Sequence, residues 1–284
     1  MEGTVGITPP RVLTIAGTDS GGGAGIAADL RTFAAFGVHG CLAVSAVTVQ
    51  DTVGVSGVHP IPAATVAAQI AAVADDIGLD AAKTGMLATT EIVEAVAAAC
   101  DGSGIGAGRR TPLVVDPVAA SRYGDPLLAG TALDAYRTLL IPRATVVTPN
   151  LDEVRLLVGI EVHDRAAQHD AAKALHDLGP RYVLVKGGHL REDEAECVDL
   201  LYDGATFTEF AGPRFDTGDT HGSGDSMAAA IAAGLARALA PEAAVALAKR
   251  YVVEAVRHAY ALGAGHGPVS ALWAVRPWWE GSPR

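Results

Sequence analysis

The strongest candidate for chemistry is a glycine-rich stretch that leads into a predicted helix, His221-Gly222-Ser223-Gly224-Asp225. The backbone N–H groups of Gly222, Ser223 and Gly224 can converge on one point, where the helix N-terminus adds about half a positive charge. Such an anion hole suits a transferring phosphoryl group, and Asp225 would then accept the proton of an attacking hydroxyl. The alternative is that Asp225 only caps the helix. We expect His221 to be a partly buried histidine without a catalytic role.

Oxygen-bearing side chains lie where two further predicted strands end. Asp116 follows an apolar run, and Asn150 and Glu153 open the helix after the next strand. Their oxygens suit a magnesium ion that keeps most of its waters, and a buried Asp116 would need a cation or hydrogen-bond donors. The spacing of Asn150 and Glu153 fits a capping box equally well. Both interpretations remain open.

Lys186 ends another predicted strand and precedes Gly187-Gly188, so its ammonium group can reach a phosphate where the backbone also comes close. A solvated lysine without a ligand is the alternative. A further glycine cluster, Gly17 to Gly25, follows the first predicted strand. Its Gly23-x-Gly25-x-x-Ala28 pattern, with Asp51 further on, satisfies the dinucleotide fingerprint. In that fingerprint, however, the first glycine closes the strand-to-helix turn directly, whereas here a longer loop runs from Gly17 to Gly23. A nicotinamide-dependent oxidoreductase is therefore a remote alternative.

The elements that must position these residues alternate along the chain. Continuous apolar runs separated by Ala-rich amphipathic stretches predict an α/β fold: a mostly parallel sheet with helices on both faces, binding ligands beyond the carboxyl ends of its strands. No linker divides residues 1–284, so we expect one domain. Predicted strands are 12–16, 42–49, 82–85, 113–117, 144–148 and 182–186, with a type I′ hairpin of 197–202 and 206–210 around Asp203-Gly204. Predicted helices are 25–36, 63–77, 90–99, 126–139, 151–157, 165–178, 223–239 and 241–262.

Composition excludes several classes of protein. The 284 residues are 50% hydrophobic and 19% charged. Glycine accounts for 33 of the 284 residues, about 12% against the usual ~7%. A net charge of −11 argues against nucleic-acid and anionic-membrane partners. Neither a membrane helix nor a signal peptide is recognisable, and the three cysteines lack the spacing of a disulfide framework or zinc site. We expect a cytoplasmic protein. The tail with Trp273, Trp278 and Trp279 is assigned no function.

With six ordered motifs, residues 11–270 resemble the ribokinase-like superfamily, and within it the hydroxymethylpyrimidine and hydroxymethylpyrimidine-phosphate kinases of thiamine biosynthesis. The resemblance implies a three-layer ribokinase-like fold and two successive ATP-dependent phosphorylations, first of the pyrimidine's hydroxymethyl oxygen and then of the monophosphate. It also implies a homodimer. The motifs are Ala16-Gly17-Thr18-Asp19-Ser20-Gly21-Gly22-Gly23-Ala24-Gly25-Ile26, Lys83-Thr84-Gly85-Met86-Leu87, Val115-Asp116-Pro117-Val118, Thr148-Pro149-Asn150-Leu151-Asp152-Glu153, Val185-Lys186-Gly187-Gly188-His189 and His221-Gly222-Ser223-Gly224-Asp225.

Carried over residue by residue, the resemblance assigns the pyrimidine pocket. An aminopyrimidine offers an amino donor and ring-nitrogen acceptors to an acid and a carboxamide, while its flat face favours apolar contact. The pocket residues are Gly17, Asp29 and Gln50, with Met86 and Val118 as apolar neighbours. For Asp29 the residues alone favour a solvated helix acid near Arg31.

The same resemblance assigns the phosphate side of the site. Lys186 and Asn150 match ATP-binding positions, Asp116 and Glu153 match acids around magnesium, and Asp225 matches the catalytic position.

The chain departs from the family pattern at two positions, Asp225 and Ala27. Many members have cysteine where this chain has Asp225, and glutamine is common where it has Ala27. A carboxylate at 225 suits an alcohol nucleophile, whereas the monophosphate is already anionic and would be repelled unless cations screen the charge. A pyridoxal kinase is the alternative within this class, and a nucleotide-binding regulatory module without turnover is the third.

Overall fold

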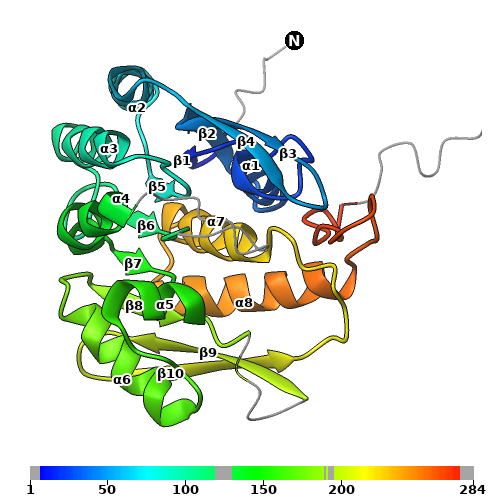
Figure 1. Cartoon of the computed structure of the whole chain (residues 1–284). Helices are drawn as coiled ribbons and strands as arrows, with labels where there is room; N and C mark the ends of the chain where they lie inside the picture. The colour runs from blue at the N-terminus through cyan, green and yellow to red at the C-terminus, as the bar shows by residue number, and fades with distance from the viewer. Residues whose placement is uncertain (1–6, 119–129, 189, 191–194, 276–284) are drawn as a thin grey trace, which may run out of the picture.

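An eight-stranded sheet forms the centre of the molecule, as the computed structural model of residues 7–118, 130–188, 190 and 195–275 shows (Figure 1). Its order is β10-β9-β8-β7-β6-β5-β1-β2, and the strands from β8 to β2 run parallel to their neighbours. β9 and β10 are antiparallel. The strands are β1 (Arg11–Ala16), β2 (His39–Val44), β5 (Ala81–Thr84), β6 (Leu113–Val115), β7 (Val146–Val147), β8 (Tyr182–Val185), β9 (Glu196–Tyr202) and β10 (Phe207–Pro213).

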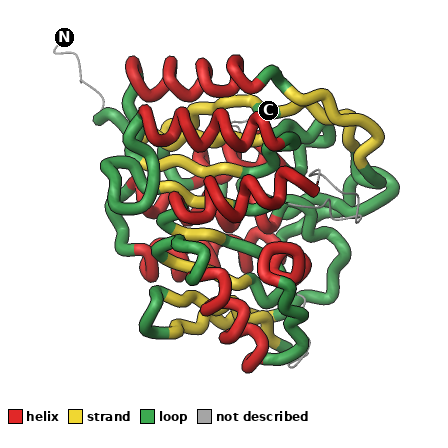
Figure 2. Tube along the Cα trace, turned by 60° about the vertical axis from the view of Figure 1, so that its left-hand side comes forward, coloured by secondary structure: helices red, strands yellow, loops and turns green. Residues whose placement is uncertain are grey.

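Helices cover both faces of this sheet (Figure 2). Buried side chains of α1, α7 and α8 pack on one face, and those of α2, α3, α5 and α6 pack on the other. The predicted three-layer arrangement is therefore confirmed. The helices are α1 (Gly25–Ala35), α2 (Ala63–Asp76), α3 (Thr90–Gly102), α4 (Gly130–Ala135), α5 (Leu151–Val158), α6 (Arg165–His176), α7 (Ser223–Ala236) and α8 (Pro241–Arg257), and a π-helical turn (Tyr136–Leu140) follows α4.

The strands are apolar on both sides because the sheet lies between two layers. In β1, Val12 contributes to the cluster under α7 and α8, whereas Leu13 contributes to the opposite cluster, and neither is exposed. This alternation follows from the two-residue period of a strand. Within the described residues, no helix is long and apolar enough to cross a membrane.

The predicted strand 42–49 is wrong in one respect, because the chain leaves the central sheet at Ser45. Its first part ends β2, and its second part is β3 (Ala46–Gln50), which pairs with β4 (Val55–Pro60) in a separate two-stranded sheet. Ser45 is buried, and its Oγ donates to the Met86 carbonyl at 2.6 Å. This side-chain hydrogen bond to a residue distant in sequence fixes the turn.

The predicted hairpin is present, but its type I′ turn is wrong. Of Asp203 and Gly204, only the glycine has a positive φ, whereas a type I′ turn requires two such residues. Asp203 Oδ1 instead accepts the N–H groups of Ala205 and Thr206 at 2.8 and 2.6 Å, which gives a longer loop. The predicted helix 126–139 begins outside the described residues, and its remainder is α4 with the π-helical turn.

Candidate active site

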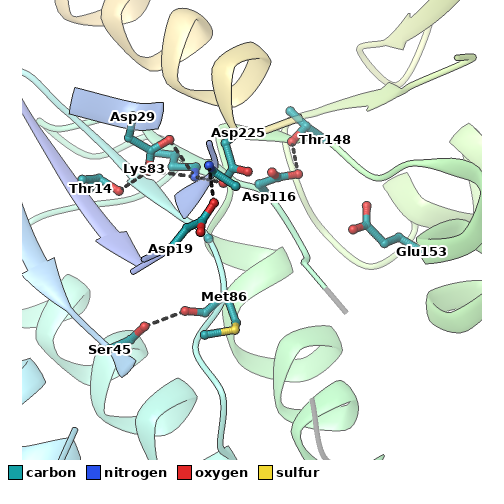
Figure 3. Close-up of polar contacts among 12 residues, drawn as sticks. Thr14, Asp19, Asp29, Ser45, Lys83, Met86, Asp116, Thr148, Glu153 and Asp225 are labelled. Carbon is teal, nitrogen blue, oxygen red and sulfur yellow. Dashed lines mark hydrogen bonds and ion pairs between the residues drawn. The ribbon is translucent and has the colours of Figure 1, made fainter. Parts of the chain in front are cut away.

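A buried lysine joins two aspartates near the end of β5 (Figure 3). Lys83 Nζ lies 3.0 Å from both carboxylate oxygens of Asp29, on α1, and 3.3 Å from Oδ1 of Asp225, on α7. Thr14 Oγ1 donates to the same Asp29 carboxylate at 2.6 Å. Asp29 and Lys83 are both fully buried.

This arrangement differs from both expectations for Asp29. Its carboxylate is neither solvated nor presented to a ligand, because Thr14 and Lys83 engage its oxygens below the surface. The structure therefore makes Asp29 a support for Lys83 rather than a direct contact of the pyrimidine. The sequence motif contained Lys83, but nothing in the spacing indicated that α1 and α7 bring one carboxylate each to its ammonium group.

The charged groups of this cluster shift one another's pKa values. Burial raises the pKa of Asp29, which the Lys83 charge opposes and the Asp225 charge reinforces. Burial also disfavours the ammonium form of Lys83, but the surrounding carboxylates Asp29, Asp225 and Asp116 outweigh it and raise the pKa of Lys83. Lys83 therefore remains a cation throughout the physiological range.

Asp225 does not cap its helix. The N-cap of α7 is Gly222, which makes no side-chain capping bond, and the Asp225 carboxylate faces Lys83 instead. Gly222 has φ +78°, and an added Cβ would overlap the Gly23 carbonyl oxygen, so only glycine fits there. Of the three expected anion-hole donors, the Ser223 N–H donates to the Thr220 carbonyl at 3.2 Å.

Lys186 lies between two acids on the other side of the α7 start. Its Nζ is 3.0 Å from Asp116 Oδ1 and 4.0 Å from Glu153 Oε2, and Thr148 Oγ1 donates to the same Asp116 oxygen at 3.0 Å. A Cβ added to Gly224 would lie 3.3 Å from Lys186 Nζ, so this lysine adjoins the glycine turn. Burial lowers the pKa of Lys186, but Asp116 and Glu153 outweigh it and the pKa is raised. Lys186 is thus not a solvated surface lysine.

Asn150 and Glu153 form the capping box of α5. Asn150 Oδ1 accepts the Glu153 N–H at 2.9 Å, and Glu153 Oε2 accepts the Asn150 N–H at 2.7 Å. The same Glu153 oxygen is the one that faces Lys186. Capping and electrostatic contact are therefore compatible for Glu153, while ATP binding by Asn150 stays a prediction.

Apolar residues of the predicted pyrimidine pocket lie together. Met86 packs with Ala46, and Val118 packs against this small cluster. Gly17 adjoins it, because an added Cβ would overlap Met86 Cε. Gln50 ends the strand that Ala46 begins and is partly exposed. Gly17, Met86 and Val118 thus border one region, Gln50 lies at the other end of β3 from Ala46, and contact of these residues with a substrate stays a prediction.

Asp19 and His221 connect the two glycine-rich loops. Asp19 Oδ2 lies 2.8 Å from His221 Nε2 and accepts the N–H groups of Gly23 and Ala24, while Oδ1 accepts that of Gly21. The buried His221 ring is therefore engaged by the Asp19 side chain. Sequence reasoning gave Asp19 no role, although an aspartate followed by glycines is a recognisable local acceptor.

We expect Asp19→Asn to lower the free energy of unfolding by about 1–3 kcal/mol at neutral pH, because a buried charged acceptor of several N–H groups is lost. Burial raises the pKa of Asp19, but hydrogen bonds and charge from His221 and the backbone N–H groups of Ala24 and Gly21 lower it overall. A lowered folded-state pKa stabilises the protein above the unfolded-state pKa, and this contribution disappears as pH falls through the folded-state value.

Urea unfolding of both proteins from neutral to acid pH checks this prediction. The difference between wild type and Asp19→Asn should shrink on acidification, and the exposed Asp76→Asn variant should show no such difference. A difference that stays constant with pH would contradict an ionised Asp19.

Asp116 and Glu153, the two acids beside Lys186, are also the residues predicted to hold magnesium. No group of three or more His, Cys, Asp or Glu side chains within the described residues could hold a metal by itself. Asp116 and Glu153 nevertheless offer oxygens beside the helix start, which fits a magnesium ion that keeps most of its waters and binds through one or two carboxylates and phosphate.

The dinucleotide fingerprint is not realised. Asp51 lies in the turn between β3 and β4, where its Oδ1 accepts the N–H groups of Val53 and Gly54 at 2.8 and 3.0 Å. In a dinucleotide fold the ribose-binding acid instead follows the second parallel strand. The departure of the chain at Ser45 places Asp51 outside the central sheet.

Comparison with known proteins agrees with this geometry. Residues 19–270 match the model of the phosphomethylpyrimidine kinase family. A hydroxymethylpyrimidine/phosphomethylpyrimidine kinase of Mycobacterium tuberculosis is 59% identical over 270 residues, covering 95% of this chain and 96% of the relative.

Two solved kinases resemble the whole fold. A Staphylococcus aureus pyridoxal kinase in complex with AMP-PCP and pyridoxal has a TM-score of 0.84 at 34% identity, covering 94% and 95% of the two chains. A Clostridium difficile phosphomethylpyrimidine kinase has a TM-score of 0.76 at 35% identity, covering 87% of this chain and 99% of its own. These neighbours confirm the ribokinase-like fold, and the chain belongs to the phosphomethylpyrimidine kinase family.

Proposed function

We propose that this chain transfers the γ-phosphoryl group of ATP to the hydroxymethyl oxygen of 4-amino-5-hydroxymethyl-2-methylpyrimidine, and then to the resulting monophosphate, in thiamine biosynthesis. The observation that carries the proposal is the Asp225 carboxylate, which faces Lys83 instead of capping α7, at a glycine turn that adjoins Lys186. The name of the Mycobacterium tuberculosis relative supports the acceptor, and the AMP-PCP complex of the Staphylococcus aureus kinase supports ATP.

In the first reaction, Asp225 takes the proton that leaves the hydroxymethyl group as its oxygen attacks the γ-phosphorus, and the bond from this phosphorus to the β–γ bridging oxygen breaks to release ADP. The N–H groups of Gly222, Ser223 and Gly224 stabilise negative charge on the transferring group, for which the Ser223 N–H exchanges its weak internal bond. Lys186 supplies a fixed positive charge to the ATP phosphates. In the second reaction the nucleophile is a phosphate oxygen, which needs no base.

The charge of the site supports a magnesium ion. Two lysines, Lys83 and Lys186, face the four carboxylates of Asp29, Asp225, Asp116 and Glu153, so the formal charge is negative before any phosphate binds. Asp116 and Glu153 would hold the ion through its waters. Bound there, magnesium would neutralise charge on the ATP phosphates.

The pyrimidine would lie against the apolar cluster. Gly17, Met86 and Val118 would offer apolar contacts to the flat face of the ring, and the Gln50 carboxamide would pair with the amino group and ring nitrogens.

A coupled ADP-release assay with the pyrimidine alcohol, its monophosphate and pyridoxal as separate acceptors tests the function. We expect turnover with both pyrimidines. Turnover with pyridoxal alone would replace the proposal by the pyridoxal kinase alternative, and ATP binding without any turnover would favour the regulatory module.

We also propose a homodimer in which the two copies pack against each other through the two-stranded sheet of β3 and β4. Val47, Val49 and Val58 of β3 and β4 are 45%, 62% and 41% exposed, which is unusual for valines and favours burial against a second copy. Sedimentation analysis gives the mass that decides this point. A cytoplasmic location is proposed as well, supported by three unpaired cysteines.

A further inference from the structure

Lys83 is the one cation in the described site that cannot touch a ligand. It has no exposed surface, and its ammonium group is fixed between Asp29 and Asp225 (Figure 3). Of its two carboxylate partners, Asp225 is the one whose side chain reaches the surface, with 17% exposed, so Asp225 is the direct link between Lys83 and a ligand.

The position of Lys83 goes beyond what a structural ion pair requires. Asp29 alone offers Lys83 two oxygens at 3.0 Å, and Thr14 holds that carboxylate in place. The additional approach to Asp225 Oδ1 at 3.3 Å brings positive charge directly behind the group at the anion hole. Because Lys83 is fully buried and Asp225 is mostly buried, this charge is screened less than a surface charge would be.

The two proposed acceptors make opposite demands on residue 225. The alcohol must lose a proton, which an ionised carboxylate can accept. The monophosphate arrives with negative charge of its own, so a bare carboxylate at the same place would repel it. A neutral side chain at this position would avoid that conflict, whereas an aspartate does not.

We propose that Lys83 is a charge-compensating residue that makes Asp225 compatible with a phosphorylated acceptor. It does so without contacting substrate, by offsetting part of the negative charge of Asp225 from the protein interior, while Asp29 and Thr14 hold it in position. The inference rests on the proposed function, since it concerns the second of the two phosphorylations.

The test compares Asp29→Asn/Lys83→Met with Asp29→Asn, since the double change removes the buried charges together and avoids leaving Asp29 ionised without a partner. KM and kcat are measured at pH 8 with the alcohol and with the monophosphate as separate acceptors. Loss of Lys83 should raise KM for the monophosphate about tenfold and change KM for the alcohol less than about threefold.

A second comparison removes the charge that Lys83 is proposed to neutralise. In Asp29→Asn/Asp225→Asn, adding Lys83→Met should no longer raise KM for the monophosphate. An equal rise with and without the Asp225→Asn change, or equal losses with both acceptors, would overturn the inference and leave Lys83 a structural role.

Two controls keep these results interpretable. Wild type is assayed first, because absence of turnover with either pyrimidine would contradict the proposed function itself rather than the role of Lys83. Circular dichroism checks that each variant folds. If Asp29→Asn/Lys83→Met does not fold, Asp29→Leu/Lys83→Met, which replaces the pair by apolar side chains, takes its place.

Discussion

Asp225→Asn should slow phosphorylation of the pyrimidine alcohol by roughly 10²- to 10⁴-fold, the range expected for loss of a general base. The asparagine has nearly the same shape, so the start of α7 and the apolar cluster should be retained. Phosphorylation of the monophosphate should fall much less, because its nucleophile carries no proton that must be removed. Single-turnover rates with each acceptor at saturating ATP measure the two effects separately.

The matched control is Asp152→Asn, which removes an exposed acid from the first turn of α5. Asp225 and Asp152 both lie where a helix dipole favours negative charge, but Asp225 contacts Lys83 whereas Asp152 is exposed. Asp152→Asn should leave both rates unchanged within about twofold. If Asp225→Asn slowed the phosphorylation of the alcohol and of the monophosphate equally, the charge of Asp225 would support the anion hole rather than proton transfer.

Features set by local sequence were predictable from the sequence. The alternation of apolar strands with amphipathic helices gave the layers and the parallel order, because a strand covered on both faces must be apolar throughout. The capping box of Asn150 and Glu153 was recognisable from its spacing alone. The glycine turn before Asp225 was likewise visible, because Gly222 and Gly224 directly flank the start of a helix-forming stretch.

Contacts between distant segments were not predictable. Lys83 reads as an ordinary residue at the end of a strand, and only the packing of α1 and α7 on the sheet brings Asp29 and Asp225 to it. Asp19 and His221 are 202 positions apart and pair across the two loops. The turn at Ser45 depends on the Met86 carbonyl, so a continuous β-rich run could not reveal that it crosses from one sheet to another.

Asp29 shows how the two sources of information differ. The motif resemblance assigned it to the pocket, whereas its burial makes it the support of a lysine that the residues alone gave no role. Position in a motif identifies the neighbourhood of a residue, and the hydrogen bonds determine its task within that neighbourhood.

Lys186→Ala should lower kcat/KM for ATP by about 10²- to 10³-fold with either acceptor, because both reactions use the same phosphate donor. The loss has two physical parts: a fixed charge beside the glycine turn disappears, and Asp116 and Glu153 lose the cation that lies between them. Initial rates over a range of ATP concentrations measure the effect, with the exposed Lys173→Ala as the control that removes a lysine from α6. The ratio of the two phosphorylation rates should stay constant, in contrast to Asp225→Asn, since Lys186 is proposed to act on the donor and not on the acceptor. A loss confined to one acceptor would place Lys186 against the pyrimidine phosphate instead of ATP.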